Sequence, residues 1–306
     1  MYGLSDAQYG KDNVRLYKVH RDAGTGVQTV YELTVCVLLE GDIESSYTKE
    51  DNSVLVTTDA IKNTCYIVAK HNPVHPPELY GSILGKHFIT QYNHIHTAHI
   101  DITCHTWERM TIENEPHPHS FFQDGSVKRQ IRVDVSKASG TDITSAIFGL
   151  SVLKSTRSEF WGYIKDEYTT LPETWDRILS SDVDIKWKWK HFEDVADVKA
   201  NVSHFVEAFV KARDASFKAF AEDNSMSAQA TLYKMAERFL DCVPLADAVE
   251  YSWPNKHYVE IDLSWHKGIR NTDKDAEVYL PQSAPNGLIK GTLTRSTLDK
   301  SRSAKL

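Results

Sequence analysis

The chain has 306 residues, 41% hydrophobic and 25% charged, a composition typical of a soluble globular protein with one large or two smaller domains. A formal net charge of −7 argues against a nucleic-acid-binding protein, which is usually basic overall or in one block. No apolar run approaches the ~20 residues of a membrane helix, and we expect neither a membrane anchor nor a secretory signal.

Alternation of apolar and polar residues predicts strands in the first half of the chain, over residues 13–21, 27–41, 94–110 and 127–137. Between the second and third of these strands, apolar residues at helical spacing predict a helix over 57–72, with Thr58 or Asp59 as its N-cap. A second helix is predicted to open at Pro76-Pro77-Glu78, because proline is favoured in a first helical turn. The predicted order is therefore β-β-α-α-β-β.

The same order is predicted again after Gly140. Its strands are predicted over residues 143–156, 181–190, 256–265 and 276–281. Between the second and third of them, two helices are predicted from apolar stripes that begin at Val198 and at Leu232. Each half is expected to form an antiparallel sheet with two helices on one face, so the predicted fold class is α+β, with domains over 1–140 and 141–306.

The stretch HIHTAHIDITCHTWERM, residues 94–110, has the composition of a metal site. Successive side chains of a strand point to opposite faces, so His94 and His96 share one face while His99 and His105 share the other. His99 and His105 are then about 20 Å apart, and the two remaining ligands fall short of a stable zinc site. We therefore expect His99 and His105 to line the polar face of a sheet, and none of these histidines to bind a metal.

Three short stretches offer better candidates for chemistry. Lys11 directly precedes the first strand, and Thr58 and Asp59 open the first helix, where free N–H groups and the helix dipole can receive an anion. A turn predicted at the dipeptide PN places Asn255 and His257 at the mouth of the next strand. Each also has a plainer interpretation from the residues alone: a solvated lysine, an ordinary N-cap, and a histidine of the core.

Six stretches resemble the urate oxidase (uricase) family in order and approximate spacing: YGKDNVRLYKV, NSVLVTTDAIKNT, HIHTAHIDITCHTWERM, SEFWGYIKDEYTTLPETWDRI, SAQATLYKMAERF and PNKHY. The resemblance implies two tandem tunnelling-fold (T-fold) domains and their assembly into a tunnel-shaped barrel. It also implies a homotetramer with active sites at subunit interfaces. The implied reaction is the oxidation of urate by dioxygen to 5-hydroxyisourate and hydrogen peroxide, with no cofactor.

The resemblance also implies roles for individual residues. Lys11 and Thr58 would form a diad that moves protons together with His257 and bound water, while Asn255 would hold water or dioxygen above the purine ring. The implied substrate contacts come from the backbone N–H groups of Thr58, Asp59 and Ala228, the amide of Gln229, the guanidinium of Arg177 and the ring of Phe160. The family usually has a larger aliphatic residue at Ala228, but a backbone contact survives that change.

The implied chemistry is physically coherent. Urate is an electron-rich anion, and its further deprotonated form can give an electron to dioxygen without metal or flavin. The protein then has to deprotonate urate, orient it, and exclude bulk water from the site. The C-terminal Ala304-Lys305-Leu306 is a variant of the S-K-L signal, which predicts a peroxisomal location and binding to the peroxisomal import receptor.

Three alternatives remain open from the sequence. A non-catalytic purine-binding T-fold protein would keep Arg177, Gln229 and Phe160 but would have no use for the Lys11–Thr58 pair. A metal-dependent T-fold enzyme acting on purines or pterins, such as a zinc cyclohydrolase, would need a convincing His/Cys ligand set. A copper oxidase would use the histidine-rich strand.

Overall fold

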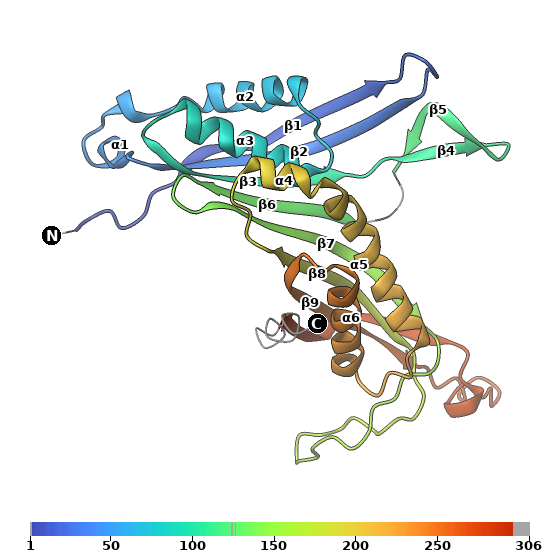
Figure 1. Cartoon of the computed structure of the whole chain (residues 1–306). Coiled ribbons are helices and arrows are strands. Elements are labelled where there is room, and N and C mark those ends of the chain that lie inside the picture. The colour runs from blue at the N-terminus through green and yellow to red at the C-terminus, as the bar shows by residue number, and fades with distance from the viewer. Residues whose placement is uncertain (1, 124, 126, 296–306) are drawn as a thin grey trace, which may run out of the picture. The chain divides into compact units, whose positions relative to one another are not determined.

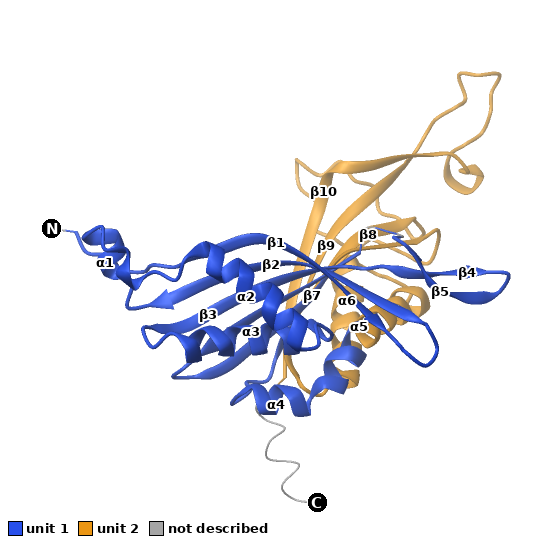
Figure 2. Cartoon of the chain, turned by 90° about the horizontal axis from the view of Figure 1, so that it is seen from above, with its two compact units in different colours: residues 1–147, 187–209 blue, residues 148–186, 210–306 orange. Residues whose placement is uncertain are grey.

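The computed structural model describes residues 2–123, 125 and 127–295 (Figure 1). The chain forms two compact units: unit 1 comprises residues 1–147 and 187–209, and unit 2 comprises 148–186 and 210–306 (Figure 2). Within the described ranges, no helix has both the length and the apolar character needed to cross a membrane.

The core of unit 1 is a sheet with helices on one face. Its strands follow the order β1 (Tyr9–Arg21), β2 (Gln28–Gly41), β3 (Ile95–His105), β6 (Lys128–Ser136) and β7 (Gly140–Lys154). The helices α2 (Thr58–His71) and α3 (Pro77–Gln91) lie on one side of this sheet (Figure 1). Gly81 and Gly85 let α3 approach β6 closely, since an added Cβ would lie 2.8 Å from Val133 Cγ2 and 2.5 Å from Val135 Cγ2, respectively.

Shorter elements complete unit 1, namely α1 (Glu44–Thr48), η1 (Asn52–Val54), β4 (Glu108–Ile112), β5 (Glu115–Phe122) and α4 (Val195–Ala200). β4 and β5 form a separate two-stranded sheet. The predicted single strand over 94–110 is therefore wrong beyond His105, where the chain leaves the main sheet and turns back on itself as this hairpin.

A buried ion pair links four elements of unit 1. Glu78 of α3 is fully buried and Arg129 of β6 is 6% exposed. Arg129 Nη2 donates to both Glu78 carboxylate oxygens at 2.8 Å. The Ser145 hydroxyl of β7 donates to Glu78 Oε1 at 2.7 Å and accepts from Trp189 Nε1 at 2.9 Å. The charges are thus hydrogen-bonded as well as paired, as burial requires.

Unit 2 contains the strands β8 (Leu179–Trp189), β9 (Ala246–Glu260) and β10 (Tyr279–Thr294), in the order β7-β8-β9-β10. Strands β7 and β8 and the helix α5 (Val202–Glu222) contribute residues to both units. The helix α6 (Ala228–Cys242) packs on β9 and β10, and the turn η2 (Asp273–Asp275) lies between those two strands in the chain.

The predicted α+β class and most of the predicted elements are confirmed, but the strand predicted over 256–265 is wrong. Strand β9 begins at Ala246 and ends at Glu260, so Pro254 and Asn255 lie inside a strand and form no turn. Pro254 pairs with Leu288 of β10, and the register of the two strands shifts only beyond Asn255, between Gln282 and Gly287 of β10. A further correction concerns α2, whose N-cap is Thr57 rather than Thr58 or Asp59.

Candidate functional site

Unit 1 places two predicted site residues, Thr58 and Asp59, in the first turn of α2. The hydroxyl of Thr57 accepts a hydrogen bond from the Ala60 N–H at 3.1 Å and so caps the helix. By helix geometry, the N–H groups of Thr58 and Asp59 have no acceptor within the helix. They point out of its positive end and can receive an anion.

Strand β1 brings Lys11 to the same region. Tyr9 of β1 accepts a hydrogen bond from the Val56 N–H at 2.6 Å, which ties the segment before α2 to the strand. The pKa of Asp59 is held below its usual value mainly by Lys62, 2.6 Å away, with smaller contributions from other neighbours that include the charge of Lys11. The charge of Lys11 therefore acts on the first turn of α2, which carries Thr58 and Asp59.

Unit 2 brings Phe160 and Arg177 into contact. Phe160 pairs with Thr174 through two backbone hydrogen bonds of 2.8 and 3.0 Å. The guanidinium carbon of Arg177 lies 5.0 Å from the centroid of the Phe160 ring, and its Nε donates to the Ser158 hydroxyl at 3.3 Å. Burial lowers the pKa of Arg177. The guanidinium lies over the aromatic ring, and these are the two kinds of group that recognise a planar anion.

The start of α6 repeats the arrangement at the start of α2. The hydroxyl of Ser227 accepts from the Ala230 N–H at 3.1 Å, so the N–H groups of Ala228 and Gln229 are left without an acceptor in the helix. Ala228 is 4% exposed, whereas the Gln229 side chain is exposed. Unit 2 thus offers a second helix terminus that can receive an acceptor atom.

Strand β9 carries Asn255 and His257 on one face, because they are two residues apart. Asn255 is 8% exposed, and its Oδ1 is buried without a hydrogen-bond partner among the described residues. His257 is half-buried and lies opposite Gln282 of β10. An unpaired buried amide oxygen is costly in a native protein and therefore points to a functional role.

His99 and His105, on the polar face of β3, have hydrogen-bonding partners in the protein. His99 contacts Asp134 at 2.6 Å and Glu40 at 3.1 Å, and these two carboxylates raise its pKa, Asp134 most strongly. His105 lies 2.8 Å from the Thr34 hydroxyl. Over the described residues, no group of three or more His, Cys, Asp and Glu side chains is arranged to hold a metal ion.

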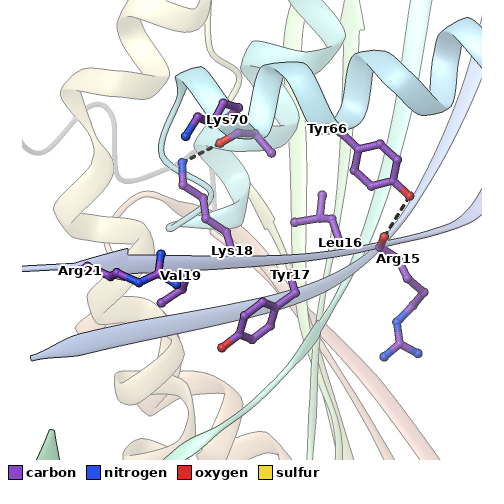
Figure 3. Close-up of a pocket in the computed structure, with 9 residues that line it drawn as sticks. Arg15, Leu16, Tyr17, Lys18, Val19, Arg21, Tyr66 and Lys70 are labelled. Carbon is purple, nitrogen blue, oxygen red and sulfur yellow. Dashed lines mark hydrogen bonds between the residues drawn. The ribbon is translucent and has the colours of Figure 1, made fainter. Parts of the chain in front are cut away.

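A cavity of about 440 Å³ lies beside β1 and the C-terminal half of α2 (Figure 3). It is lined by Arg15, Leu16, Tyr17, Lys18, Val19, Arg21, Tyr66, Ala69 and Lys70. The positive charge of Lys18 is already used within the protein. Its Nζ donates to two carbonyls at the C-terminal end of α2, those of Ala69 at 2.6 Å and Asn72 at 2.7 Å. None of the predicted site residues lines this cavity.

Comparisons with known proteins agree with this geometry. The sequence model of the family described as Uricase matches residues 7–134 and 143–290. The chain is 63% identical to the uricase of Aspergillus flavus over 298 residues, which cover 97% of this chain and 99% of that one. The chain belongs to the uricase family. Its activity is therefore that of a urate oxidase, an enzyme of purine metabolism.

Other members of the uricase family are also similar. The uricase of Emericella nidulans is 59% identical over 300 residues, which cover 98% of this chain and all of that one. The crystal structure of uricase from Arthrobacter globiformis matches with a TM-score of 0.84 at 35% identity, and covers 97% of this chain and 96% of that one. The α+β fold is thus that of known uricases.

Some residues that shape the candidate site of this uricase-family chain were not predicted. They are Lys154, Ser158, Ser225 and Thr231, which hold the segments around Phe160, Arg177 and α6. The hydrogen bonds from Lys154 to Ser225 and from Arg177 to Ser158 join segments distant in sequence, so no local pattern could reveal them. Only the family resemblance pointed to the segments that they support.

Proposed function

We propose that the chain oxidises urate with dioxygen to 5-hydroxyisourate and hydrogen peroxide without a metal or organic cofactor. Urate and dioxygen are the substrates that family membership implies. One observation above all supports the residue assignment, namely the contact between Phe160 and Arg177, whose guanidinium carbon lies 5.0 Å from the ring centroid. The same unit also holds the start of α6, where the N–H groups of Ala228 and Gln229 have no acceptor within the helix. Such a surface recognises a planar anion by stacking, by charge and by hydrogen bonds.

In the proposed site, Arg177 makes a bidentate contact to the six-membered ring of urate, and Gln229 and the Ala228 N–H pair with other edges of the purine. Phe160 stacks on its face. The N–H groups of Thr58 and Asp59 meet the five-membered ring. Orientation by several fixed donors reduces the entropic cost of the reaction.

Proton transfer is assigned to Lys11, Thr58 and His257. Lys11 and the Thr58 hydroxyl form the diad that moves protons to and from the purine through bound water, and His257 relays them. Asn255 holds water or dioxygen above the ring, a role supported by its unpaired buried Oδ1. General acid–base groups of this kind contribute about 10²- to 10⁴-fold in rate.

The two groups of site residues belong to different units, and we propose that they meet across subunit interfaces of a homotetramer. The tandem T-fold domains would span 1–140 and 141–306, and would close into a tunnel-shaped barrel. The outermost strands support this proposal, because β1 and β10 are long end strands in the sheet order, and an open strand edge is a template for pairing. Peroxisomal import through Ala304-Lys305-Leu306, which lies outside the described residues, would contain the peroxide.

The decisive experiment is a urate assay on metal-stripped, chelator-treated protein. We expect loss of the ultraviolet band of urate together with oxygen consumption and peroxide formation. Loss of activity on chelation and its return with copper or zinc would show the metal-dependent T-fold enzyme or the copper oxidase instead. Urate binding without oxygen consumption would show the non-catalytic purine-binding protein.

A further inference from the structure

Lys154 of β7 holds its ammonium inside unit 2. Its Nζ donates to the carbonyls of Phe220 at 3.2 Å and Asp223 at 2.8 Å, at the end of α5, and to the Ser225 hydroxyl at 2.7 Å. It also lies 5.2 Å from the centroid of the Phe220 ring. Burial lowers the pKa of Lys154. An ammonium has three protons to donate, and here all three have an acceptor.

Ser225 connects this ammonium to the first turn of α6. The hydroxyls of Ser225 and Thr231 are 2.6 Å apart, and both residues are fully buried. The Thr231 hydroxyl also lies 3.2 Å from the carbonyl oxygen of Ser227, the N-cap of α6. The chain of hydrogen bonds from Lys154 through Ser225 to Thr231 therefore fixes the turn from which the N–H groups of Ala228 and Gln229 project.

The same serine fixes the segment that carries Phe160 and contacts Arg177. The Ser225 carbonyl accepts from the Glu159 N–H at 2.8 Å, and the Ser225 N–H donates to the Arg157 carbonyl at 3.0 Å. Between these two residues lies Ser158, which is fully buried and whose hydroxyl accepts from Arg177 Nε at 3.3 Å. Both walls of the proposed purine site are thus attached to Ser225.

We infer that Lys154 is a positioning residue of the purine site, which holds Ser225 and thereby sets the spacing between the start of α6 and the Arg177 guanidinium. This inference rests on the proposed function, in which those groups bind urate. A charge-assisted hydrogen bond is stronger than a neutral one, so the ammonium holds the serine more firmly than a neutral donor could. Its loss weakens urate binding more than turnover, because Lys11 and Thr58, which move protons, are carried by other elements.

Lys18 of unit 1 provides a matched control. Its Nζ donates to two carbonyls at the end of α2, and burial lowers its pKa as it does for Lys154. Both acceptors lie at the opposite end of α2 from Thr58. Replacing Lys18 by methionine therefore removes a similar ammonium from a helix end, but leaves Ser225 and the start of α6 unchanged.

The test compares the wild type with Lys154→Met, Ser225→Ala and Lys18→Met. Methionine keeps the packing of the lysine stem, and Ser225→Ala removes one hydroxyl only. The dissociation constant of urate is measured by calorimetry without oxygen, where no turnover occurs, and KM and kcat are measured in air. Thermal unfolding shows whether each variant is folded.

We expect Lys154→Met and Ser225→Ala to raise the dissociation constant and KM about tenfold, with kcat within about threefold of the wild type. Lys18→Met should keep the wild-type dissociation constant even where its Tm falls. The inference is overturned if the two unit 2 variants bind urate as the wild type does, or if Lys18→Met weakens binding equally. If Lys154→Met does not fold, the dissociation constant of urate for Ser225→Ala alone tests the inference. A wild type that neither binds nor oxidises urate would refute the proposed function instead.

Discussion

The buried pair of Glu78 and Arg129 leads to a prediction of large magnitude. Glutamine at position 78 has nearly the same shape as glutamate and can still accept from Ser145, but it leaves the Arg129 guanidinium buried without a counter-charge. Arg129 is only 6% exposed, so water cannot replace the carboxylate. Removing one charge of such a buried pair lowers the free energy of unfolding by about 3–5 kcal/mol. For a unit of this size, 1 kcal/mol corresponds to roughly 2–4 °C, so we expect Glu78→Gln to lower Tm by about 6–20 °C.

Scanning calorimetry at fixed protein concentration measures this change. The control is Glu222→Gln, which breaks the exposed pair with Arg238, 3.1 Å apart, and should cost less than about 1 kcal/mol. The double variant Glu78→Leu with Arg129→Met removes both charges, so it should recover most of the lost stability. The reasoning is refuted if Glu78→Gln changes Tm no more than Glu222→Gln, or if the double variant is as unstable as Glu78→Gln.

Three further predictions concern catalysis, binding and pH. Lys11→Met should lower kcat about 100-fold while the dissociation constant of urate, measured without oxygen, stays within about threefold; a change in affinity alone would exclude the proton-transfer role. Arg177→Ala should raise KM about 10- to 100-fold in steady-state assays, since it removes charged hydrogen bonds to the substrate, and an unchanged KM would remove Arg177 from the site. The pKa of His99 is raised in the folded state, chiefly by its hydrogen bond to Asp134, so its stabilising contribution is fully present below the unfolded pKa of about 6.5 and is lost as pH rises through the higher folded pKa. His99→Asn should therefore lower Tm by about 2–4 °C at pH 6 and by less at pH 9, and an equal loss at both pH values would contradict the assigned shift.

The sequence was sufficient for the elements that local patterns determine. Alternating burial of Leu33, Val35, Val37 and Leu39 in β2 follows the predicted period of two. Strand β9 was misjudged at its start, although Val249, Tyr251 and Trp253 alternate in burial as a strand requires. Pro254 suggested a turn, but its strand partner Leu288 belongs to a distant part of the chain that the local pattern could not reveal.

The candidate site was less accessible to sequence reasoning than the fold. The helix predicted over 57–72 is present as α2, but its N-cap is Thr57 rather than Thr58 or Asp59, and the start of α6 at Ala228 lies ahead of the apolar stripe that predicted this helix from Leu232. The contact between Phe160 and Arg177 joins the two ends of a loop, and only family resemblance suggested that both residues meet the substrate. The bridge from Ser158 to Ser225 joins segments that no periodicity relates.

The unpaired amide oxygen of Asn255 has a practical consequence for engineering. An unsatisfied buried polar atom costs about 1–3 kcal/mol, so an apolar residue of similar size at this position would make the protein more heat-resistant. A variant library ranked by thermal tolerance alone would therefore enrich replacements of a residue assigned to oxygen or water. A selection for thermal stability should therefore keep Asn255 unchanged, or measure urate turnover of each variant together with its stability.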